Sequence, residues 1–282
     1  AEYAFFGRSV WQQTLNLTDE EKTELIRLLQ ENYRPENRVY RYNFFYDNCA
    51  TRPRDKIEES IAGKVIYPAE PQDGSLTFRD IVHQYCKGHP WARFGIDLCI
   101  GSEADQPITQ RQMMFAPFYL MDAFDGAQIK GDSIQRPLIT ANELVVDATP
   151  EPDESDWMPT PLQCSLLLFI LTAAATIYGI RRRTGLWGID LFLFGIAGIV
   201  GCVLAFLALF SQHPAVSSNF LLLVFHPGQL LFLPYIIYCV RKGKKCWYLT
   251  LNLAVLTLFI VLFPVIPQRF DFAVVPLALV LL

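Results

Sequence analysis

Cys49 lies in the stretch of this chain whose residue types are best suited to chemistry. The capping residues Asp47 and Asn48 precede it, and Arg52 and Arg54 follow it at the predicted start of a helix. Unpaired amides and the positive end of a helix dipole lower the pKa of a thiol, and nearby guanidinium groups act in the same direction. We therefore predict that Cys49 is a nucleophile. A small buried hydrophobic residue, which most free cysteines are, is the alternative.

The residues beside Cys49 could also contact a substrate. An arginine can hold a phosphate headgroup through paired hydrogen bonds, so Arg52 and Arg54 are candidate binding residues together with Asn48. A solvated helix face is the other interpretation of the two arginines. The segment 39–46 alternates and is rich in aromatic residues, which predicts a strand that leads into the Cys49 helix.

Two further helices are predicted from their capping residues. The pattern at 18–21 is a capping box for a helix that reaches about Tyr33, and the pattern at 77–80 caps a helix that reaches about Cys86. The apolar residues of the second helix share one face, and His83 lies off that face.

His83 is the candidate general base, because an imidazole is the usual partner of a reactive thiol. It follows Cys49 by 34 residues in the sequence, so only the fold can bring the two together. A surface histidine is the alternative. Asp97 could orient this histidine or simply cap a loop, and both interpretations stay open.

The cysteines do not indicate a metal site or a disulfide framework. The chain has seven, and Cys49, Cys86 and Cys99 form an odd set without a C-x-x-C spacing. No metal and no cofactor are predicted.

Charge divides the chain in two. Residues 1–160 carry 16 Lys and Arg against 26 Asp and Glu, a net charge of −10, whereas residues 161–282 carry 8 against 2, a net charge of +6. The first part has a globular composition and the second that of a membrane protein. Neither has the basic, aromatic-rich surface of a nucleic-acid-binding protein. We predict an extracytoplasmic domain at 1–147, an acidic Pro-rich linker at 148–161 and a transmembrane domain at 162–282.

Apolar runs near the ~20 residues of a spanning helix predict the membrane topology. The predicted spans are about 163–180, 187–210, 219–240 and 247–266, with a fifth, truncated run from about 272.

Basic clusters predict the orientation of these spans. Arg181–Arg183 lies between the first and second spans, and the cluster at 241–245 lies between the third and fourth. The positive-inside rule places both on the cytoplasmic side, so the N-terminal domain is predicted on the opposite face. Polar residues toward that outer side, His213, Asn219 and His226, are candidate substrate contacts, with helix–helix hydrogen bonding as the alternative.

Several motifs together resemble a known family. YNFFYDNCATRPRD at 42–55, TFR at 77–79, PW at 90–91 and FGIDL at 94–98 resemble the Lnb N-terminal periplasmic domain family, and the multi-span tail fits the same proteins. The resemblance implies an α+β, permuted papain-like cysteine-enzyme domain followed by an all-α multi-span membrane domain. It also implies an inner-membrane thiol acyltransferase whose N-terminal domain faces the periplasm.

The implied reaction is a step in bacterial lipoprotein maturation. A phospholipid acyl chain would pass to Cys49 as a thioester and then to the N-terminal amine of a lipoprotein, so the partners are a phospholipid donor, a lipoprotein acceptor and the bilayer, and no nucleic acid. The family pattern also includes an upstream Gly-His segment, which this chain is expected to lack. The general base is therefore either His83 or a residue of that segment.

Two other functions stay open at this point. A membrane-anchored peptidase or amidase of cell-wall peptides could use the same thiol chemistry. A non-catalytic membrane sensor or scaffold would instead keep Cys49 buried and unreactive.

Overall fold

The chain divides into two compact units. The computed structural model describes residues 2–68, 76–131, 135–148 and 158–282. Unit 1 comprises Ala1–Ile81 and Pro107–Glu154, and unit 2 comprises Val82–Gln106 and Ser155–Leu282. The segment 82–106, which the sequence interpretation assigns to the N-terminal domain, thus groups with the C-terminal helices. Most of the predicted linker, at 149–157, lies outside the described residues.

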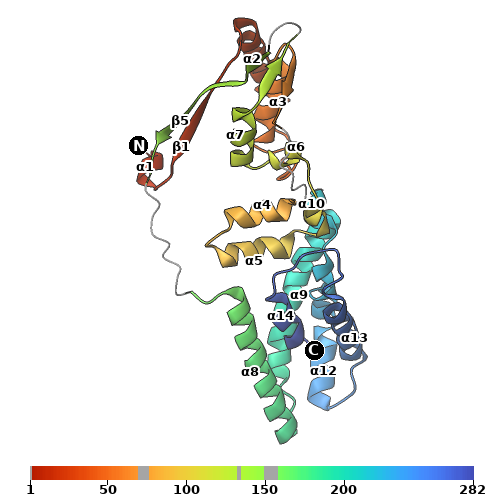
Figure 1. The fold of residues 1–282 in the computed structure, drawn as a ribbon. Coiled ribbons are helices and arrows are strands. Elements are labelled where there is room, and N and C mark those ends of the chain that lie inside the picture. The colour runs from red at the N-terminus through yellow and green to blue at the C-terminus, as the bar shows by residue number, and fades with distance from the viewer. Residues whose placement is uncertain (1, 69–75, 132–134, 149–157) are drawn as a thin grey trace. The chain divides into compact units, whose positions relative to one another are not determined.

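Unit 1 contains two small antiparallel sheets. β1 (Val10–Leu15) pairs with β5 (Ile139–Val146) in a two-stranded ribbon, drawn in red and green in Figure 1. β2 (Lys64–Ile66), β3 (Gln128–Lys130) and β4 (Gln135–Pro137) form the second sheet in that order. The mixed α/β composition predicted for this region is confirmed. The permuted papain-like fold stays a prediction.

Unit 1 also contains five α-helices among its described residues. They are α1 (Glu2–Phe5), α2 (Asp19–Asn32), α3 (Thr51–Ser60), α6 (Gln110–Met113) and α7 (Pro117–Asp125). α2 begins at the predicted capping box, in which Thr18 and Glu21 cap each other's backbone amides. The division between the units falls within α4 (Phe78–Tyr85), because Ile81 belongs to unit 1 and Val82 to unit 2.

The predicted strand at 39–46 is wrong. The structure has an isolated bridge between Asn43 and Asp47 and a tight turn between them. Each of these two residues donates its backbone N–H to the other's carbonyl, at 2.9 Å in both directions, so the backbone is closed on itself rather than extended. Aromatic content indicated a strand, but here the rings pack against other aromatic residues instead of a neighbouring strand.

Unit 2 is helical. Its extramembrane part holds the end of α4, then α5 (Pro90–Cys99) and the short 3₁₀-helix η1 (Ser102–Asp105). Pro90 stands in the first turn of α5, where its missing N–H costs no hydrogen bond, and Gly95 lies within the helix.

The first two predicted spans are confirmed as continuous helices, α8 (Pro161–Arg182) and α9 (Trp187–Phe210). Among the described residues these two are long and apolar enough to cross a membrane, and a third crossing exists if α12 (Leu233–Lys242) and α13 (Trp247–Leu262) count as one span bent by 113°. The sequence predicts four continuous spans, which differs from this count of candidate spans, and the number of crossings stays a prediction. The truncated fifth run forms the seven-residue helix α14 (Val274–Val280).

The third predicted span is broken into short pieces. They are the 3₁₀-helix η2 (Phe220–Leu223), α11 (Pro227–Leu231) and α12, preceded by α10 (Pro214–Ser217). Pro227 and Pro234 stand in the first turns of α11 and α12, because proline cannot continue a helix that precedes it. The apolar composition indicated one continuous helix, but Pro227 and Pro234 each end the helix before them and begin a new one.

Two glycines of α9 allow these pieces to pack closely. A Cβ atom on Gly201 would lie 2.4 Å from the backbone nitrogen of His226, and one on Gly198 would lie 2.5 Å from that of Leu230. Small residues at helix contacts let backbones approach in this way, so the broken segment packs closely against α9 at these two positions.

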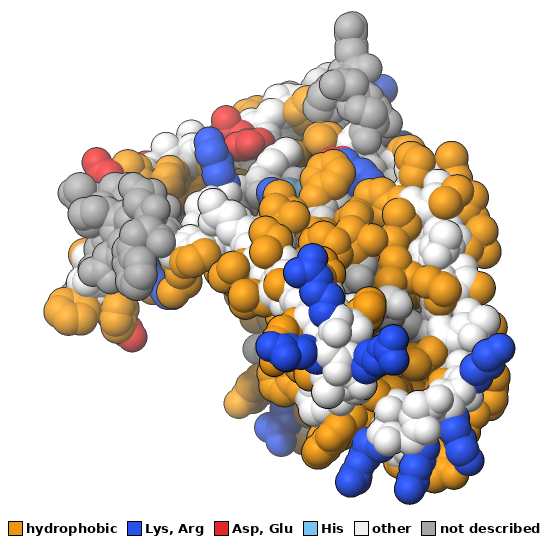
Figure 2. Space-filling view, turned by 90° about the horizontal axis from the view of Figure 1, so that it is seen from below, with side chains coloured by type: hydrophobic (Ala, Val, Ile, Leu, Met, Phe, Trp, Pro, Cys, Tyr) orange, Lys and Arg blue, Asp and Glu red, His pale blue; other side chains and the backbone are white. Residues whose placement is uncertain are grey.

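Basic side chains gather at one end of the long helices. Figure 2 shows many Lys and Arg side chains at the ends of the helices drawn lowest in Figure 1. Arg181 and Arg182 occupy the last turn of α8, and Arg241 and Lys242 that of α12. The opposite end of α8, at Pro161, carries the capping residue Thr160.

Candidate functional site

The turn before Cys49 is anchored by aromatic rings. Phe45 is 2% exposed and stacks on Phe78 of α4, with ring centroids 4.3 Å apart. Phe115 packs edge-on against both, at 5.1 and 5.3 Å. Within unit 1, this cluster fixes the backbone four residues before Cys49.

Asn48 holds the start of α3. Its side-chain Oδ1 accepts hydrogen bonds from the N–H groups of Ala50 and Thr51, at 2.8 and 2.9 Å. Its Nδ2 donates to the carbonyls of Phe44 and Phe115, at 2.9 and 2.8 Å. Asn48 is buried and both ends of its amide are occupied, so its position in the structure is that of a helix cap and a cross-link. Its predicted contact with substrate stays a prediction.

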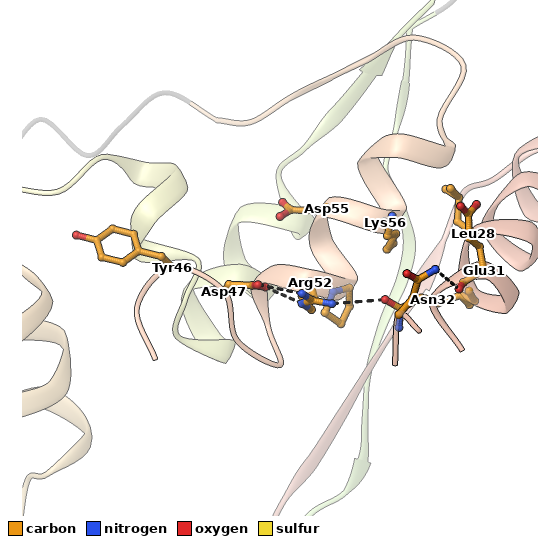
Figure 3. Close-up of a pocket in the computed structure, with 11 residues that line it drawn as sticks. Leu28, Glu31, Asn32, Tyr46, Asp47, Arg52, Asp55 and Lys56 are labelled. Atoms are coloured by element: carbon orange, nitrogen blue, oxygen red, sulfur yellow. Dashed lines mark hydrogen bonds and ion pairs between the residues drawn. The ribbon is translucent and has the colours of Figure 1, made fainter. Parts of the chain in front are cut away.

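Asp47 and Arg52 form a paired contact beside the same turn. Nε and Nη2 of Arg52 donate to the two carboxylate oxygens of Asp47, at 2.8 and 3.0 Å. The guanidinium also lies 3.3 Å from the ring centre of Tyr40. A pocket of about 620 Å³ opens next to this pair, and Figure 3 shows Arg52 between Asp47 and Asn32 on its wall. Arg52 therefore lines that pocket, and its predicted contact with substrate stays a prediction.

Arg54 is placed differently. Its side chain is 6% exposed, and its guanidinium donates to Asp55 at 2.9 Å and to the carbonyl of Arg111 at 2.9 Å. These bonds join α3 to α6 inside unit 1. We therefore leave Arg54 out of the proposed substrate contacts.

Cys49 itself is exposed between two buried neighbours, Asn48 and Ala50. Cys86 and Cys99 are less accessible, and burial raises the pKa of both thiols, with the charge of Asp97 adding to the effect at Cys86. A higher pKa means less thiolate at neutral pH, so these two are poorer nucleophiles. Exposure singles out Cys49 among the three cysteines of the extramembrane segments.

Tyr42 is a contact of Cys49 that the sequence interpretation missed. Burial raises the pKa of the Tyr42 phenol, and the charge of the Cys49 thiolate and a hydrogen bond to it add to the shift. A phenol that donates to a thiolate can hold it in place and can later donate to an oxyanion. The signal in the sequence was a tyrosine seven residues before the cysteine, which is too general to single out.

His83 and Asp97 form a pair within unit 2. His83 Nε2 lies 2.8 and 3.0 Å from the two oxygens of Asp97, which is 4% exposed and stands on α5. Because a carboxylate only accepts, Nε2 carries the proton and Nδ1 is the nitrogen that can receive one. Of the two interpretations of Asp97, the structure supports the one that orients a histidine.

A cavity of about 340 Å³ opens beside this pair. His83, Arg93 and Asp97 line it from α4 and α5, and Asp271 faces it from the segment before α14. Arg93 Nη2 pairs with Asp271 at 3.3 Å. The remaining lining residues are Pro90, Thr160, Pro161, Leu162, Phe270 and Phe272. The cavity therefore lies at the end of α8 opposite the basic cluster.

α5 and η1 are fastened to the membrane helices by hydrogen bonds. Asn219 Nδ2 donates to the carbonyl of Leu98 at 2.7 Å, and Gln268 Nε2 donates to that of Ile100 at 3.2 Å. The backbone amides of Gly101 and Ser102 donate to carbonyls in and after α10, at 2.7 and 2.9 Å. The His83–Asp97 pair is thus held on a support that belongs to the membrane region.

The polar residues predicted as outer-side contacts have internal partners. Asn219 is 6% exposed, and its Oδ1 accepts from Leu221 N–H and from Gln268. The backbone N–H of His226 donates to Gln229 at 3.4 Å, and the His226 ring lies 6.2 Å from that of Tyr248. His213 precedes α10 as its N-terminal cap residue. Their substrate role stays a prediction, and Asn219 and His226 take part in packing.

No metal centre is found in the described part of the chain. Among those residues, no group of three or more His, Cys, Asp or Glu side chains is arranged to hold a metal ion.

These features define a class of protein: a membrane protein whose mixed α/β domain presents an exposed cysteine. Family comparison then places it. The Lnb N-terminal periplasmic domain matches residues 1–83, and the Lnb transmembrane domain matches residues 153–282. Cys49 and His83 fall within the first match, and Asp97 falls between the two. The chain belongs to the Lnb family, with a periplasmic N-terminal domain and a transmembrane domain.

Comparisons with curated proteins and with solved structures give no match.

Proposed function

We propose that this protein is a lipoprotein N-acyltransferase of a bacterial inner membrane, facing the periplasm. The observation that supports this most is the exposed Cys49 on a loop fixed by Asn48, inside the Lnb N-terminal domain. The membrane region supplies the second argument, because it keeps a lipid donor within reach of the domain.

The first half-reaction loads the cysteine. The Cys49 thiolate attacks the carbonyl carbon of a phospholipid ester, a C–S bond forms, and the ester C–O bond breaks. The alkoxide of the lysophospholipid leaves with the proton that the thiol gave up. The backbone N–H of Cys49 and the Tyr42 hydroxyl are the donors we assign to the oxyanion.

The second half-reaction transfers the acyl chain. The N-terminal amine of the acceptor attacks the thioester, a C–N bond forms, the C–S bond breaks, and the amine loses a proton as the thiolate returns. His83, oriented by Asp97, is the base we assign to these proton transfers. Arg52 is the residue we assign to the donor headgroup.

The experiment is to trap the thioester. The full chain in phospholipid nanodiscs should carry a hydroxylamine-labile acyl group on Cys49, detected by intact mass and by peptide mapping. Cys49→Ala should lose both this adduct and all transfer to a diacylglyceryl-cysteinyl peptide, whereas Cys86→Ala should keep both. A transfer-competent protein without an acyl group on Cys49 would refute the proposal.

A further inference from the structure

Seven exposed cationic side chains lie on two loops of the membrane domain. One group closes α8 and the turn after it, and the other closes α12 and the turn after it. The N-terminal domain is periplasmic and α8 follows it as a helix long enough to cross a membrane, so the last turn of α8 faces the cytoplasm. We call these seven residues the basic face: Arg181, Arg182, Arg183, Arg241, Lys242, Lys244 and Lys245.

The two loops of the basic face touch each other within unit 2. A Cβ atom on Gly185 would lie 3.0 Å from the carbonyl oxygen of Val240, so the turn after α8 runs against the end of α12. The guanidinium carbon of Arg241 lies 5.2 Å from the centre of the Trp187 ring at the start of α9. The cations of both loops therefore form one surface, and Figure 2 shows Lys and Arg side chains gathered there among hydrophobic ones.

The basic face has little opposing charge. In the segment 161–268 the sequence has one carboxylate, Asp190, in the first turn of α9. The ion pairs between described residues all involve other cations. Seven cations against one carboxylate leave a charge of at least +6. Like charges on adjacent loops repel one another, so an anionic ligand is attracted to this face and relieves the repulsion.

Two further cations are held against aromatic rings, as Arg241 is. The guanidinium of Arg182 lies 5.8 Å from the ring centre of Tyr178. The ammonium of Lys244 lies 5.2 Å from the ring centre of Tyr238 and donates to its hydroxyl at 3.0 Å. A cation on a ring keeps its charge but has less rotational freedom, so less entropy is lost when it binds a phosphate.

The same rings indicate that the anion belongs to a lipid. Tyr178, Tyr238 and Trp187 are 57%, 48% and 42% exposed, at the ends of apolar helices where a bilayer meets water. A free phosphate would contact the cations and leave these rings in water. A phospholipid brings a phosphate and acyl chains together, so it fits both parts of the surface.

We propose that the basic face binds a phospholipid with two phosphate groups, diphosphatidylglycerol (cardiolipin), with one phosphate at each loop. Arginine and lysine donate charge-assisted hydrogen bonds to phosphate oxygens, and basic surfaces between membrane helices suit such headgroups. A lipid with one phosphate would engage one loop and leave the cations of the other without an anion. The contact between Gly185 and Val240 brings both loops within reach of one headgroup. This site is separate from the chemistry proposed for Cys49.

The test measures binding to the full chain. The protein in a neutral detergent is titrated with cardiolipin, phosphatidylglycerol and inorganic pyrophosphate, and the bound ligand is counted by native mass spectrometry. Cardiolipin should bind about tenfold more tightly than phosphatidylglycerol, because a second phosphate adds contacts with further cations. Pyrophosphate, which has two phosphates and no acyl chains, should bind at least about tenfold more weakly than cardiolipin.

Arg182→Gln combined with Arg241→Gln removes one cation from each loop. This double variant should lower the affinity for cardiolipin about tenfold. Arg34→Gln combined with Arg38→Gln is the matched control, because it removes the same charge from two exposed positions in unit 1. The control should leave the affinity for cardiolipin within about twofold of the original value.

A second variant keeps every charge, and with it the charges that orient the spans in the membrane. Trp187→Leu removes the ring beneath Arg241 and should weaken cardiolipin binding about threefold. Trp247→Leu is its control, since Trp247 is 54% exposed and packs against Phe232 and Tyr235 instead of a cation. This control should bind cardiolipin as the original protein does.

Three results would overturn the inference. Equal affinities for cardiolipin and phosphatidylglycerol would show that no second phosphate is recognised. Equal losses in the loop variant and the unit 1 variant would show that total charge, and not the basic face, attracts the lipid. Pyrophosphate binding as tight as that of cardiolipin would assign the face to a soluble anion. The thioester on Cys49 tests the proposed function separately, so either proposal can fail without the other.

Discussion

The loop that carries Cys49 and the helices that carry His83 and Asp97 are held in place by contacts of different range. Around Cys49, the turn at 43–47, the Asn48 cap and the Asp47–Arg52 pair join residues at most five positions apart, and the longer contacts, from Asn48 and Phe45 to Phe115, stay within unit 1. The support for Asp97 instead comes from Asn219 and Gln268, whose bonds reach across 121 and 168 positions.

This difference explains what each site needs in order to form. The Cys49 loop is specified by a short run of residues and a nearby aromatic cluster, so it can form with unit 1 alone. The His83–Asp97 pair is specified by the packing of α5 on membrane helices, so it depends on the folded transmembrane region. A reactive thiol and its candidate base are therefore stabilised by separate sets of contacts.

The largest effect on acyl transfer is expected when the His83–Asp97 pair is broken. Asp97→Asn removes the carboxylate that holds Nε2–H, so His83 loses its fixed tautomer, and acyl transfer should fall about 100-fold. The rate against pH is the first measurement, because a purely structural role would not move its profile. An activity within twofold of the original protein would contradict the assigned role of Asp97.

Cys86 provides an internal check on the same variant. Burial and then the charge of Asp97 raise the pKa of the Cys86 thiol. Asp97→Asn removes the second cause, so that pKa should fall, more thiolate should be present near pH 8, and iodoacetamide should modify Cys86 faster. Cys49 should react with iodoacetamide at the same rate in this variant as in the original protein, which would show that the loop around Cys49 is intact.

A smaller effect, on the free energy of unfolding, is expected from a substitution in the Cys49 loop. Asn48→Asp places a carboxylate against the carbonyls of Phe44 and Phe115, which need a donor, so unfolding in detergent micelles should cost about 2–3 kcal/mol less. Asn43→Asp is the control, because the Asn43 side chain accepts from the amides of Phe45 and Tyr46 and a carboxylate can do the same. An equal loss of unfolding free energy in both variants would show that the amide of Asn48 contributes no more to stability than that of Asn43.

The same difference in range decides what could be predicted from the sequence. The capping box at Thr18, the helices α8 and α9, and Cys49 near a helix start could be predicted, because each depends on neighbouring residues. The turn at 43–47 was missed, since aromatic alternation does not show that the rings pack on Phe78 and Phe115.

The candidate site was predictable only in part. His83 and Asp97 were identifiable as residue types, but their pairing depends on how α4 and α5 pack against each other. The sequence does not reveal the backbone carbonyls to which the Arg54 and Asn219 side chains donate in the structure. The residue type alone does not show whether a polar side chain already has hydrogen-bond partners inside the protein.

The smallest expected effect tests the long-range support directly. Gln268 joins the end of α5 to the start of η2, because its Oε1 accepts from Phe220 N–H and its Nε2 donates to Ile100 and Asn219. Gln268→Leu leaves a buried amide and a buried carbonyl without this partner, which costs about 1–2 kcal/mol. Hydrogen exchange should therefore accelerate at 98–106 and at 219–223.

Gln229→Leu makes the comparison specific. Gln229 is equally internal, but its side chain bonds only Val224 and His226, so its loss should accelerate exchange within 224–229 and leave 98–106 unchanged. If both variants loosen α5 alike, the segment responds to any disturbance of the membrane helices and Gln268 is no dedicated link. If neither does, α5 is held by its backbone bonds to α10 and the Ser218 carbonyl, and the side-chain contacts are secondary.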